Sequence, residues 1–222
     1  MKKLTILMAG TVVLALSPAA NAAVVIQQSP SFVQPEENVA LDVDIVPGDN
    51  ILRGTTNQTR STVLFRSATD NLASPPQGQA RIEPLSPGST DGLNQLTFSL
   101  ENGGTFTQAE FNIIASVGGT VTLSALNAAN MVIASIMPTV STSGQNFFGF
   151  LADSSTPISS ITVTSGTAQI TSIGQFRVGG VSRAVGAVPE PATWGMMLIG
   201  FGLIGGAMRR RAKVQRRVSF AL

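Results

Sequence analysis

Short segments in which apolar and polar residues alternate recur through the middle of this chain of 222 residues. The alternation is clearest in residues 39–45, 95–100, 120–125 and 131–137, and Gly, Pro, Asn and Ser lie between such segments. A period of two is typical of strands that bury one face, whereas an amphipathic helix repeats its apolar residues every three to four positions. Because no long stripe of the helical kind is present, the sequence predicts an all-β domain.

Further strand candidates favour two packed sheets. They are residues 60–66, 79–83, 105–115, 146–152, 158–164 and 168–178, the last of which is interrupted near Gly174. Together with the alternating segments they make roughly nine to eleven strands, which favours a two-sheet, jelly-roll-like β-sandwich over a small barrel. Residues 120–125 and 131–137 are expected to pair as a hairpin across the polar segment 127–130.

The composition removes most catalytic schemes. Cysteine, histidine and tyrosine are absent, and Trp194 is the single tryptophan. A Ser-His-Asp triad needs an imidazole, a Cys-His pair needs both missing residue types, and catalytic zinc sites usually take His or Cys ligands. Carboxylates remain, but the sequence alone places no two of them across a sugar ring. We therefore expect a protein that is not an enzyme and that uses no cofactor.

Clustered carboxylates admit a metal site as one interpretation. Asp42 and Asp44 would share a strand face about 7 Å apart, with Asp49 after the next turn, and calcium accepts such oxygen ligands. A solvated strand face and turn is the favoured interpretation, because no Asp-rich calcium loop is present. The sequence predicts no metal.

A group of phenylalanines admits a binding role in the same way. Phe147, Phe148 and Phe150 could stack on a sugar, since the predicted domain has no Trp or Tyr for that purpose. Phenylalanine is more often part of a core, which is the favoured interpretation here.

The chain is basic overall, but its basic residues are distributed unevenly, and their positions decide which partners the domain could bind. The chain carries 14 basic and 12 acidic residues, a formal net charge of +2 and a pI near 9.7. Eight of the basic residues lie at the two ends, so residues 23–188 hold six basic and eleven acidic residues, a net charge of −5. Such a segment has no electrostatic footprint for a phosphate backbone, and no nucleic-acid partner is predicted.

The first 22 residues have the three parts of a secretory signal. Two lysines precede the apolar residues 4–16, and Ala20 and Ala22 form an A-x-A cleavage site. We expect a signal helix that signal peptidase removes, so that the mature chain begins at Ala23. An uncleaved membrane anchor is the alternative, but the apolar stretch is short for a bilayer core of about 30 Å.

The C-terminal part has an ordered pattern of its own. Pro189, Glu190 and Pro191 come first, followed by an apolar run over residues 192–208 and a cluster of arginines. Each proline disfavours the helical region for the residue before it, so the motif should stay extended with its carboxylate beside the start of a helix. The apolar run would extend about 25 Å, which predicts a transmembrane helix.

Residues along this predicted helix indicate its orientation in the membrane and the face that could contact another helix. Trp194 would lie at the outer membrane interface, and Arg209, Arg210 and Arg211 would form a basic stop on the cytoplasmic side. Three glycines fall on one helix face that could lie close against another helix: Gly195, Gly202 and Gly206.

This order of motif, Gly-rich apolar helix and arginines closely resembles the PEP-CTERM family of sorting tails. The resemblance implies that an exosortase, an integral-membrane cysteine transpeptidase-like enzyme of diderm bacteria that usually make extracellular polysaccharide, recognises Pro189, Glu190 and Pro191. Residues 194–208 would then be a transient anchor. The family's tails generally end soon after the basic cluster, whereas residues 212–222 continue this chain. A plain anchor that is never processed is the alternative.

The sequence thus predicts five segments: a signal peptide (1–22), a β-sandwich ectodomain (23–178), a linker (179–188), a PEP-CTERM sorting signal (189–211) and a cytoplasmic tail (212–222). The expected protein is exported, held transiently in the inner membrane, and then placed at the cell surface or in the extracellular matrix of a diderm bacterium. A structural or interaction role is favoured. A lectin-like adhesin that binds extracellular polysaccharide is the alternative, and a carbohydrate-active enzyme is less favoured.

Overall fold

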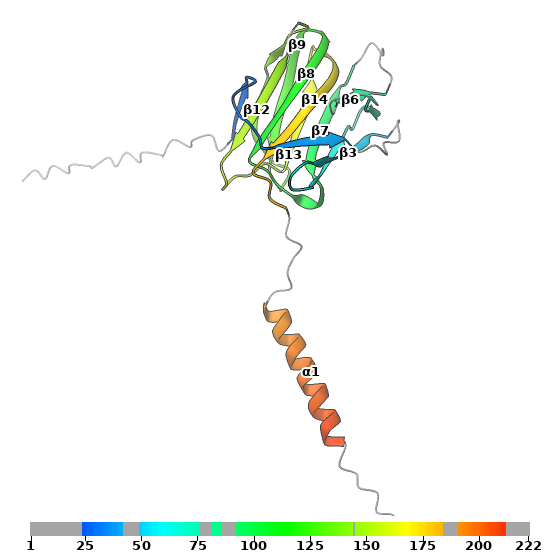
Figure 1. Ribbon diagram of the computed structural model, residues 1–222, viewed down its shortest axis with the longest axis vertical. Coiled ribbons are helices and arrows are strands. Elements are labelled where there is room, and N and C mark those ends of the chain that lie inside the picture. The colour runs from blue at the N-terminus through cyan, green and yellow to red at the C-terminus, as the bar shows by residue number, and fades with distance from the viewer. Residues whose placement is uncertain are drawn as a thin grey trace, which may run out of the picture. The chain divides into compact units, whose positions relative to one another are not determined.

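The computed structural model describes residues 24–41, 49–75, 81–85, 92–143, 145–183 and 191–211. The chain divides into two compact units between Arg183 and Ala184; strands make up the first, and the second contains a helix (Figure 1). Several predictions fall outside the described residues. They concern the signal peptide 1–22 with Ala20 and Ala22, the mature terminus Ala23, the carboxylates Asp42 and Asp44, the motif residues Pro189 and Glu190, and the tail 212–222.

The described part of the first unit contains fourteen strands and a short 3-10 turn at Glu101–Gly103. The strands are β1 (Val24–Gln28), β2 (Glu37–Leu41), β3 (Ile51–Thr56), β4 (Thr62–Arg66), β5 (Leu72–Ala73), β6 (Arg81–Pro84), β7 (Gln95–Leu100), β8 (Gln108–Val117), β9 (Gly119–Leu126), β10 (Val132–Ile136), β11 (Thr139–Val140), β12 (Asn146–Ala152), β13 (Ser160–Ser165) and β14 (Gln169–Gly179).

The strands form a barrel-like sandwich from one continuous sheet. Along the sheet the order is β1-β12-β8-β14-β2-β3-β4-β7-β13-β9-β10, and β6 also pairs with β14. One layer contains β12, β8 and β14, which run side by side in Figure 1. Because β2 pairs with β14 on one side and with β3 on the other, hydrogen bonding continues from this layer into the next. The prediction of an all-β domain is confirmed for the first unit. The two sheets that the sequence favoured over a barrel are joined into one continuous sheet, because β2 pairs with both β14 and β3, and the jelly-roll topology stays a prediction.

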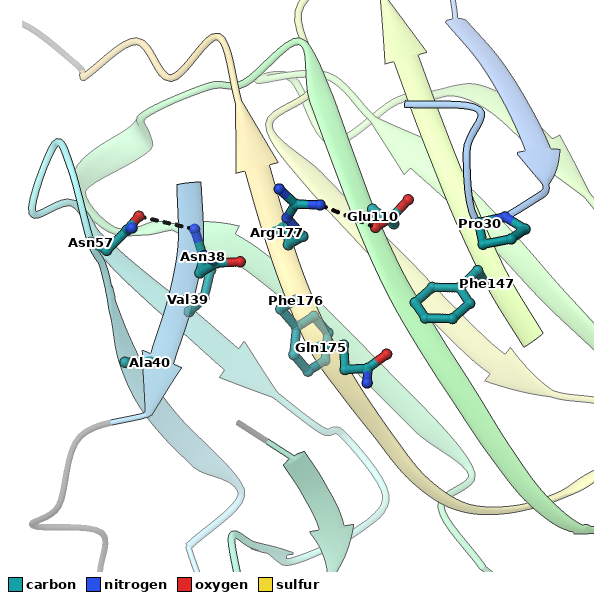
Figure 2. Close-up of a pocket in the computed structure, with 10 residues that line it drawn as sticks. All are labelled: Pro30, Asn38, Val39, Ala40, Asn57, Glu110, Phe147, Gln175, Phe176 and Arg177. Carbon is teal, nitrogen blue, oxygen red and sulfur yellow. Dashed lines mark hydrogen bonds and ion pairs between the residues drawn. The ribbon is translucent and has the colours of Figure 1, made fainter. Parts of the chain in front are cut away.

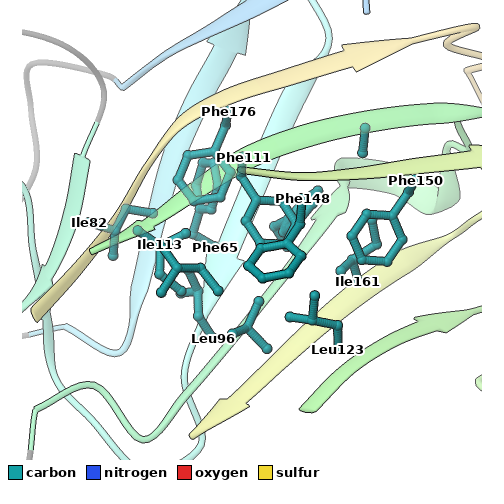
Figure 3. Close-up of a cluster of buried hydrophobic side chains, with 14 of the residues drawn as sticks. Phe65, Ile82, Leu96, Phe111, Ile113, Leu123, Phe148, Phe150, Ile161 and Phe176 are labelled. Carbon is teal, nitrogen blue, oxygen red and sulfur yellow. The ribbon is translucent and has the colours of Figure 1, made fainter. Parts of the chain in front are cut away.

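Phenylalanines from both layers meet in the core. The ring of Phe98 packs edge-on against Phe111 and Phe176, with centroids 5.5 Å apart in each pair. Figure 3 shows Phe111 and Phe176 close together in this core. Edge-to-face pairs of this kind add stability beyond the apolar area that they bury. The inward positions predicted from the alternation are buried: Leu96, Phe98 and Leu100 on β7, and Val121, Leu123 and Ala125 on β9.

The hairpin predicted from the sequence is present. β9 and β10 pair in antiparallel register, with Leu123 opposite Ile136. Asn127 organises the turn, since its Oδ1 accepts hydrogen bonds from the backbone amides of Ala129 and Met131, both at 3.0 Å. The polar segment that indicated a turn therefore supplies the side chain that stabilises it.

Residues 179–183, which the sequence analysis placed in the linker, are bonded to the domain. Ser182 exchanges two backbone hydrogen bonds with Thr105, at 2.8 and 2.7 Å, and Val181 packs against the core. Arg183 donates from Nε to the hydroxyl of Ser61 at 3.2 Å. The strand pattern ends at Gly179, but tertiary contacts continue to Arg183.

The second unit contains α1 (Pro191–Arg211), so the predicted helix is present. It holds Trp194, the predicted glycine face and the predicted arginine cluster. None of the helices in the described ranges is both long enough and apolar enough to cross a membrane, so the predicted transmembrane span is not shown.

Candidate binding site

A row of polar residues crosses the outer face of the layer formed by β12, β8, β14 and β2. In the strand register Glu110 of β8 lies opposite Gly149 on one side and Arg177 on the other, and Arg177 lies opposite Asn38 of β2. Side chains alternate between the two faces of a strand, so Phe111 points into the core while Glu110 points outward. The two charged residues thus share the outer face.

The connection between β1 and β2 crosses this outer face. A Cβ placed on Gly149 would lie 2.8 Å from Val33 Cγ2 and 2.9 Å from Phe32 Cδ1, and one on Gly179 would lie 3.3 Å from the Cα of Pro35. Side chains of this connection therefore pack closely over β12, and its backbone at Pro35 lies close to β14. It shields part of the polar row from solvent, which explains why Glu110 is only 4% exposed on an outward-facing position.

An open pocket of about 590 Å³ lies between this connection and β2. Figure 2 shows Arg177 and Glu110 side by side along its floor, Phe147 and Pro30 on one side, and Asn38 with Asn57 on the other. The volume falls within the range of about 300–1,000 Å³ that is usual for small-molecule sites. The lining is Pro30, Asn38, Val39, Ala40, Asn57, Glu110, Phe147, Gln175, Phe176 and Arg177.

The wall beside β2 is held by the turn that joins β3 and β4. Asn57 Oδ1 accepts a hydrogen bond from the amide of Asn38 at 3.0 Å, and the Asn57 amide donates to the carbonyl of Asn38, also at 3.0 Å. Gln58 Nε2 donates to the carbonyl of Glu36 at 2.8 Å, and the Thr59 amide donates to Glu37 Oε2 at 2.8 Å. These bonds fix the start of β2 against the turn.

Glu110 and Arg177 form a partly shielded ion pair. Arg177 Nη1 lies 3.8 Å from Glu110 Oε1, and the side chains are 36% and 5% exposed, respectively. Burial raises the pKa of Glu110, because a carboxylate loses hydration there, and the guanidinium of Arg177 offsets part of that rise. The pair places an acceptor and a donor side by side with little net charge.

Three buried polar atoms at or beside this pair have no hydrogen-bond partner among the described residues: Glu110 Oε2, Arg177 Nε and Asn112 Oδ1. Asn112 follows Glu110 on the same face of β8 and lies opposite Phe147. The buried side chain of Asn146, by contrast, is fully satisfied, since it donates to the carbonyls of Ile113 and Ser141 and accepts from the Ser141 amide, all at 3.0 Å. Among the described residues, unused hydrogen-bonding capacity therefore lies at the pocket and beside it.

The structure assigns different roles to the three phenylalanines that the sequence left as either core residues or sugar-stacking residues. Phe148 and Phe150 have no exposed surface and belong to the core, as the favoured interpretation predicted. Phe147 is only half-buried and lines the pocket. The difference follows from strand alternation in β12, because residues 148 and 150 share the inward face and residue 147 takes the other.

Sequence reasoning missed Glu110 and Arg177 as a pair. The sequence feature that could have indicated this site is the polar residue at every second position of residues 108–112. These polar residues interrupt a strand that is otherwise apolar. Among the carboxylates considered for calcium, Asp49 is exposed, and the described residues contain no group of three or more acidic residues placed to hold a metal. Glu110 is the carboxylate among the described residues that line the pocket, whereas glycosidases use a pair.

In α1, the residues of the predicted glycine face are open in the described structure. Apart from the adjacent residues and the nearby backbone of the helix itself, a Cβ placed on Gly195, Gly202 or Gly206 would meet no atom within 4 Å. Large apolar side chains project around the helix, including Met196, Leu198, Phe201 and Leu203, each at least 66% exposed.

Comparison with known proteins finds a sorting motif and a weak similarity to a solved structure. No curated protein matches the chain. A solved structure described as CBM29_1, a family 29 carbohydrate binding module from Piromyces equi, is similar over 71% of this chain and 88% of its own, with 12% identity and a TM-score of 0.28. Residues 187–211 match the PEP-CTERM protein-sorting motif, as the sequence predicted, and the chain therefore carries this sorting signal at its C-terminus.

Proposed function

We propose that the chain is an exported protein of a diderm bacterium, sorted by an exosortase and displayed at the cell surface or in the extracellular matrix in a structural or interaction role. The match of residues 187–211 to the PEP-CTERM protein-sorting motif carries this proposal. In it, signal peptidase removes residues 1–22, and Pro189, Glu190 and Pro191 are the handle that the exosortase recognises.

The role of α1 in this proposal is to retain the chain at the inner membrane until it is processed. A helix with apolar side chains on all sides needs an apolar environment, either a protein interior or a membrane. The exposed Met196, Leu198, Phe201 and Leu203 fit that requirement, and the arginines at 209–211 would favour the cytoplasmic side. The glycine face would allow close contact with a helix of the processing enzyme.

For the ectodomain we propose binding rather than catalysis. Its pocket offers hydrogen-bonding atoms and the half-buried ring of Phe147, and Glu110 lines it without a second described carboxylate. The lectin-like adhesin is the second candidate function, and the observation that favours it is this pocket with its unused polar atoms. Extracellular polysaccharide is then the proposed partner.

Substitution within the motif tests the sorting proposal. Glu190→Ala and Pro191→Ala should leave unprocessed chain in the inner-membrane fraction, because the handle is lost while the ectodomain still folds. Glu36→Ala, which removes an exposed carboxylate from the domain instead, is the matched control and should be processed like the wild type. Processing of both motif variants at the wild-type rate would show that the tail is a plain anchor.

A further inference from the structure

We propose that the pocket between the β1–β2 connection and β2 is a binding site for a neutral sugar unit, held by Glu110, Arg177 and Phe147. This inference deepens the interaction role proposed above, because it assigns the residues and the ligand class. It rests on three properties of the pocket: its unused polar atoms, its aromatic ring and its charge balance.

The polar atoms require a ligand that both donates and accepts hydrogen bonds. Glu110 Oε2 is an acceptor, Arg177 Nε is a donor, and neither has a partner among the described residues. A buried polar atom without a partner destabilises the fold, and a charged one does so more, so these atoms are positioned at a cost to the fold. Adjacent hydroxyl groups on a sugar ring can donate to the carboxylate and accept from the guanidinium at once.

The aromatic ring supplies the apolar part of the site. Phe147 lies opposite Asn112 in the strand register and is half-buried, whereas Phe148 and Phe150 on the same strand are fully buried. Figure 2 places the Phe147 ring beside Glu110 at the edge of the pocket. A sugar presents C–H groups on one face and hydroxyls at its rim, which matches an aromatic ring next to charged hydrogen-bonding groups.

The charge of the site favours a neutral ligand over an anionic one. The positive charge of Arg177 is offset by Glu110 at 3.8 Å, and residues 23–188 carry a net charge of −5. An anionic polymer would be repelled by the domain and would find no uncompensated cation in the ion pair. A neutral hexose or pentose unit meets neither obstacle.

Binding to the full chain, purified in a detergent without a sugar headgroup, tests the proposal. The probes are neutral gluco-, galacto-, manno- and xylo-oligosaccharides, with an oligogalacturonate as the anionic probe and a short neutral peptide as a further control. Calorimetry should detect at least one neutral oligosaccharide at a Kd of about 1 mM or tighter, and neither control. The assignment would be overturned if the chain bound only the oligogalacturonate or only the peptide. It would also be overturned if the chain bound none of the probes.

Variants localise the site. Phe147→Ala and Glu110→Gln should each weaken binding by about tenfold or more, because one removes the stacking ring and the other the charged acceptor. Arg53→Ala removes a cation from the surface pair with Glu101 and should bind like the wild type. If Phe147→Ala fails to fold, two milder variants replace it. They are Phe147→Leu and Asn38→Ala, the second at an exposed residue of the pocket lining, and each should weaken binding. Unchanged affinity in the folded pocket variants would overturn the proposal.

This result is separable from the sorting proposal. Sugar binding by a chain whose Glu190→Ala variant is processed normally would support the pocket and contradict the sorting role. Normal dependence of processing on Glu190 without sugar binding would do the reverse.

Discussion

Arg177 lies directly opposite Glu110 in the antiparallel register of β14 and β8, and its Nη1 is 3.8 Å from Glu110 Oε1. The carboxylate is almost fully shielded and the guanidinium is partly exposed, so the two residues contribute unequally to the pair. Glu110 depends on Arg177 more than Arg177 depends on Glu110, because the buried charge has less water to compensate for a lost partner.

Arg177→Ala should therefore destabilise the domain in a pH-dependent way. The change removes the cation that offsets the raised pKa of Glu110, so this pKa should rise further. A folded-state pKa above the unfolded value stabilises the domain below the unfolded pKa, and that contribution is lost as the pH rises through the folded pKa. Urea unfolding should show a loss of about 1–3 kcal/mol at pH 7 that shrinks near pH 4.

Two further variants control this experiment. Arg53→Ala breaks the exposed pair with Glu101 at 3.5 Å and should cost less than about 1 kcal/mol at either pH. Combining Arg177→Ala with Glu110→Gln should abolish the pH dependence. If Arg177→Ala lost the same unfolding free energy at both pH values, the dependence of Glu110 on Arg177 would be contradicted.

Gly149→Ala tests whether the β1–β2 connection is packed tightly against β12. The added Cβ would lie 2.8 Å from Val33 Cγ2 and 2.9 Å from Phe32 Cδ1, so one or both side chains must shift. We expect a destabilisation of about 1–3 kcal/mol by denaturant unfolding. Adding Val33→Ala should recover part of this loss, because the stability effects of substitutions at contacting residues are not additive. Strict additivity of the two changes would show that they do not contact.

Asp70 should control the acid limit of stability. Burial alone would raise its pKa, but hydrogen bonds from Thr69, the Gln95 amide, Asn94 and Ser67 outweigh burial and lower it. A folded-state pKa below the unfolded value stabilises the domain above the unfolded pKa, and this contribution is lost as the pH falls through the folded pKa. Asp70→Asn should flatten the decline of unfolding free energy below about pH 4. An unchanged decline would exclude Asp70 as its source.

Much of the domain was predictable because its strands bury one face. In β7 and β9 every second residue is apolar, and these residues are buried as expected. β1 and β3 were not predicted, since β1 buries only Val24 fully and Arg53 and Gly54 interrupt the alternation in β3. Their place in the sheet comes from pairing with β12 and β4, which a local pattern does not contain.

The candidate site was less predictable because it depends on contacts between distant segments. Glu110 and Arg177 are brought together by the register of β8 and β14, and the register shifts within this pair could not be read from the sequence. The cover over Gly149 comes from residues 32 and 33, more than a hundred positions earlier. The sorting motif was predictable, in contrast, since its order of residues is local.

The glycine face of α1 should matter for processing and not for helix formation. Gly202→Leu with Gly206→Leu should leave α1 helical, because a Cβ at either position meets no atom within 4 Å outside the adjacent residues and the nearby helix backbone. The bulkier face should slow processing if it contacts a helix of the exosortase closely. Gly200→Leu, on the opposite side of the helix, is the matched control and should be processed normally. Equal rates for both variants in a pulse-chase experiment would contradict a role for this face.

Intact mass spectrometry of protein recovered from the cell surface tests the central proposal most directly, since it reports both termini at once. We expect a chain that begins at Ala23 and ends near Pro189, without Trp194 and without the eight terminal basic residues, so that an acidic domain remains. A mass that still includes residues 191–211 would show that the tail is retained and would contradict sorting by cleavage.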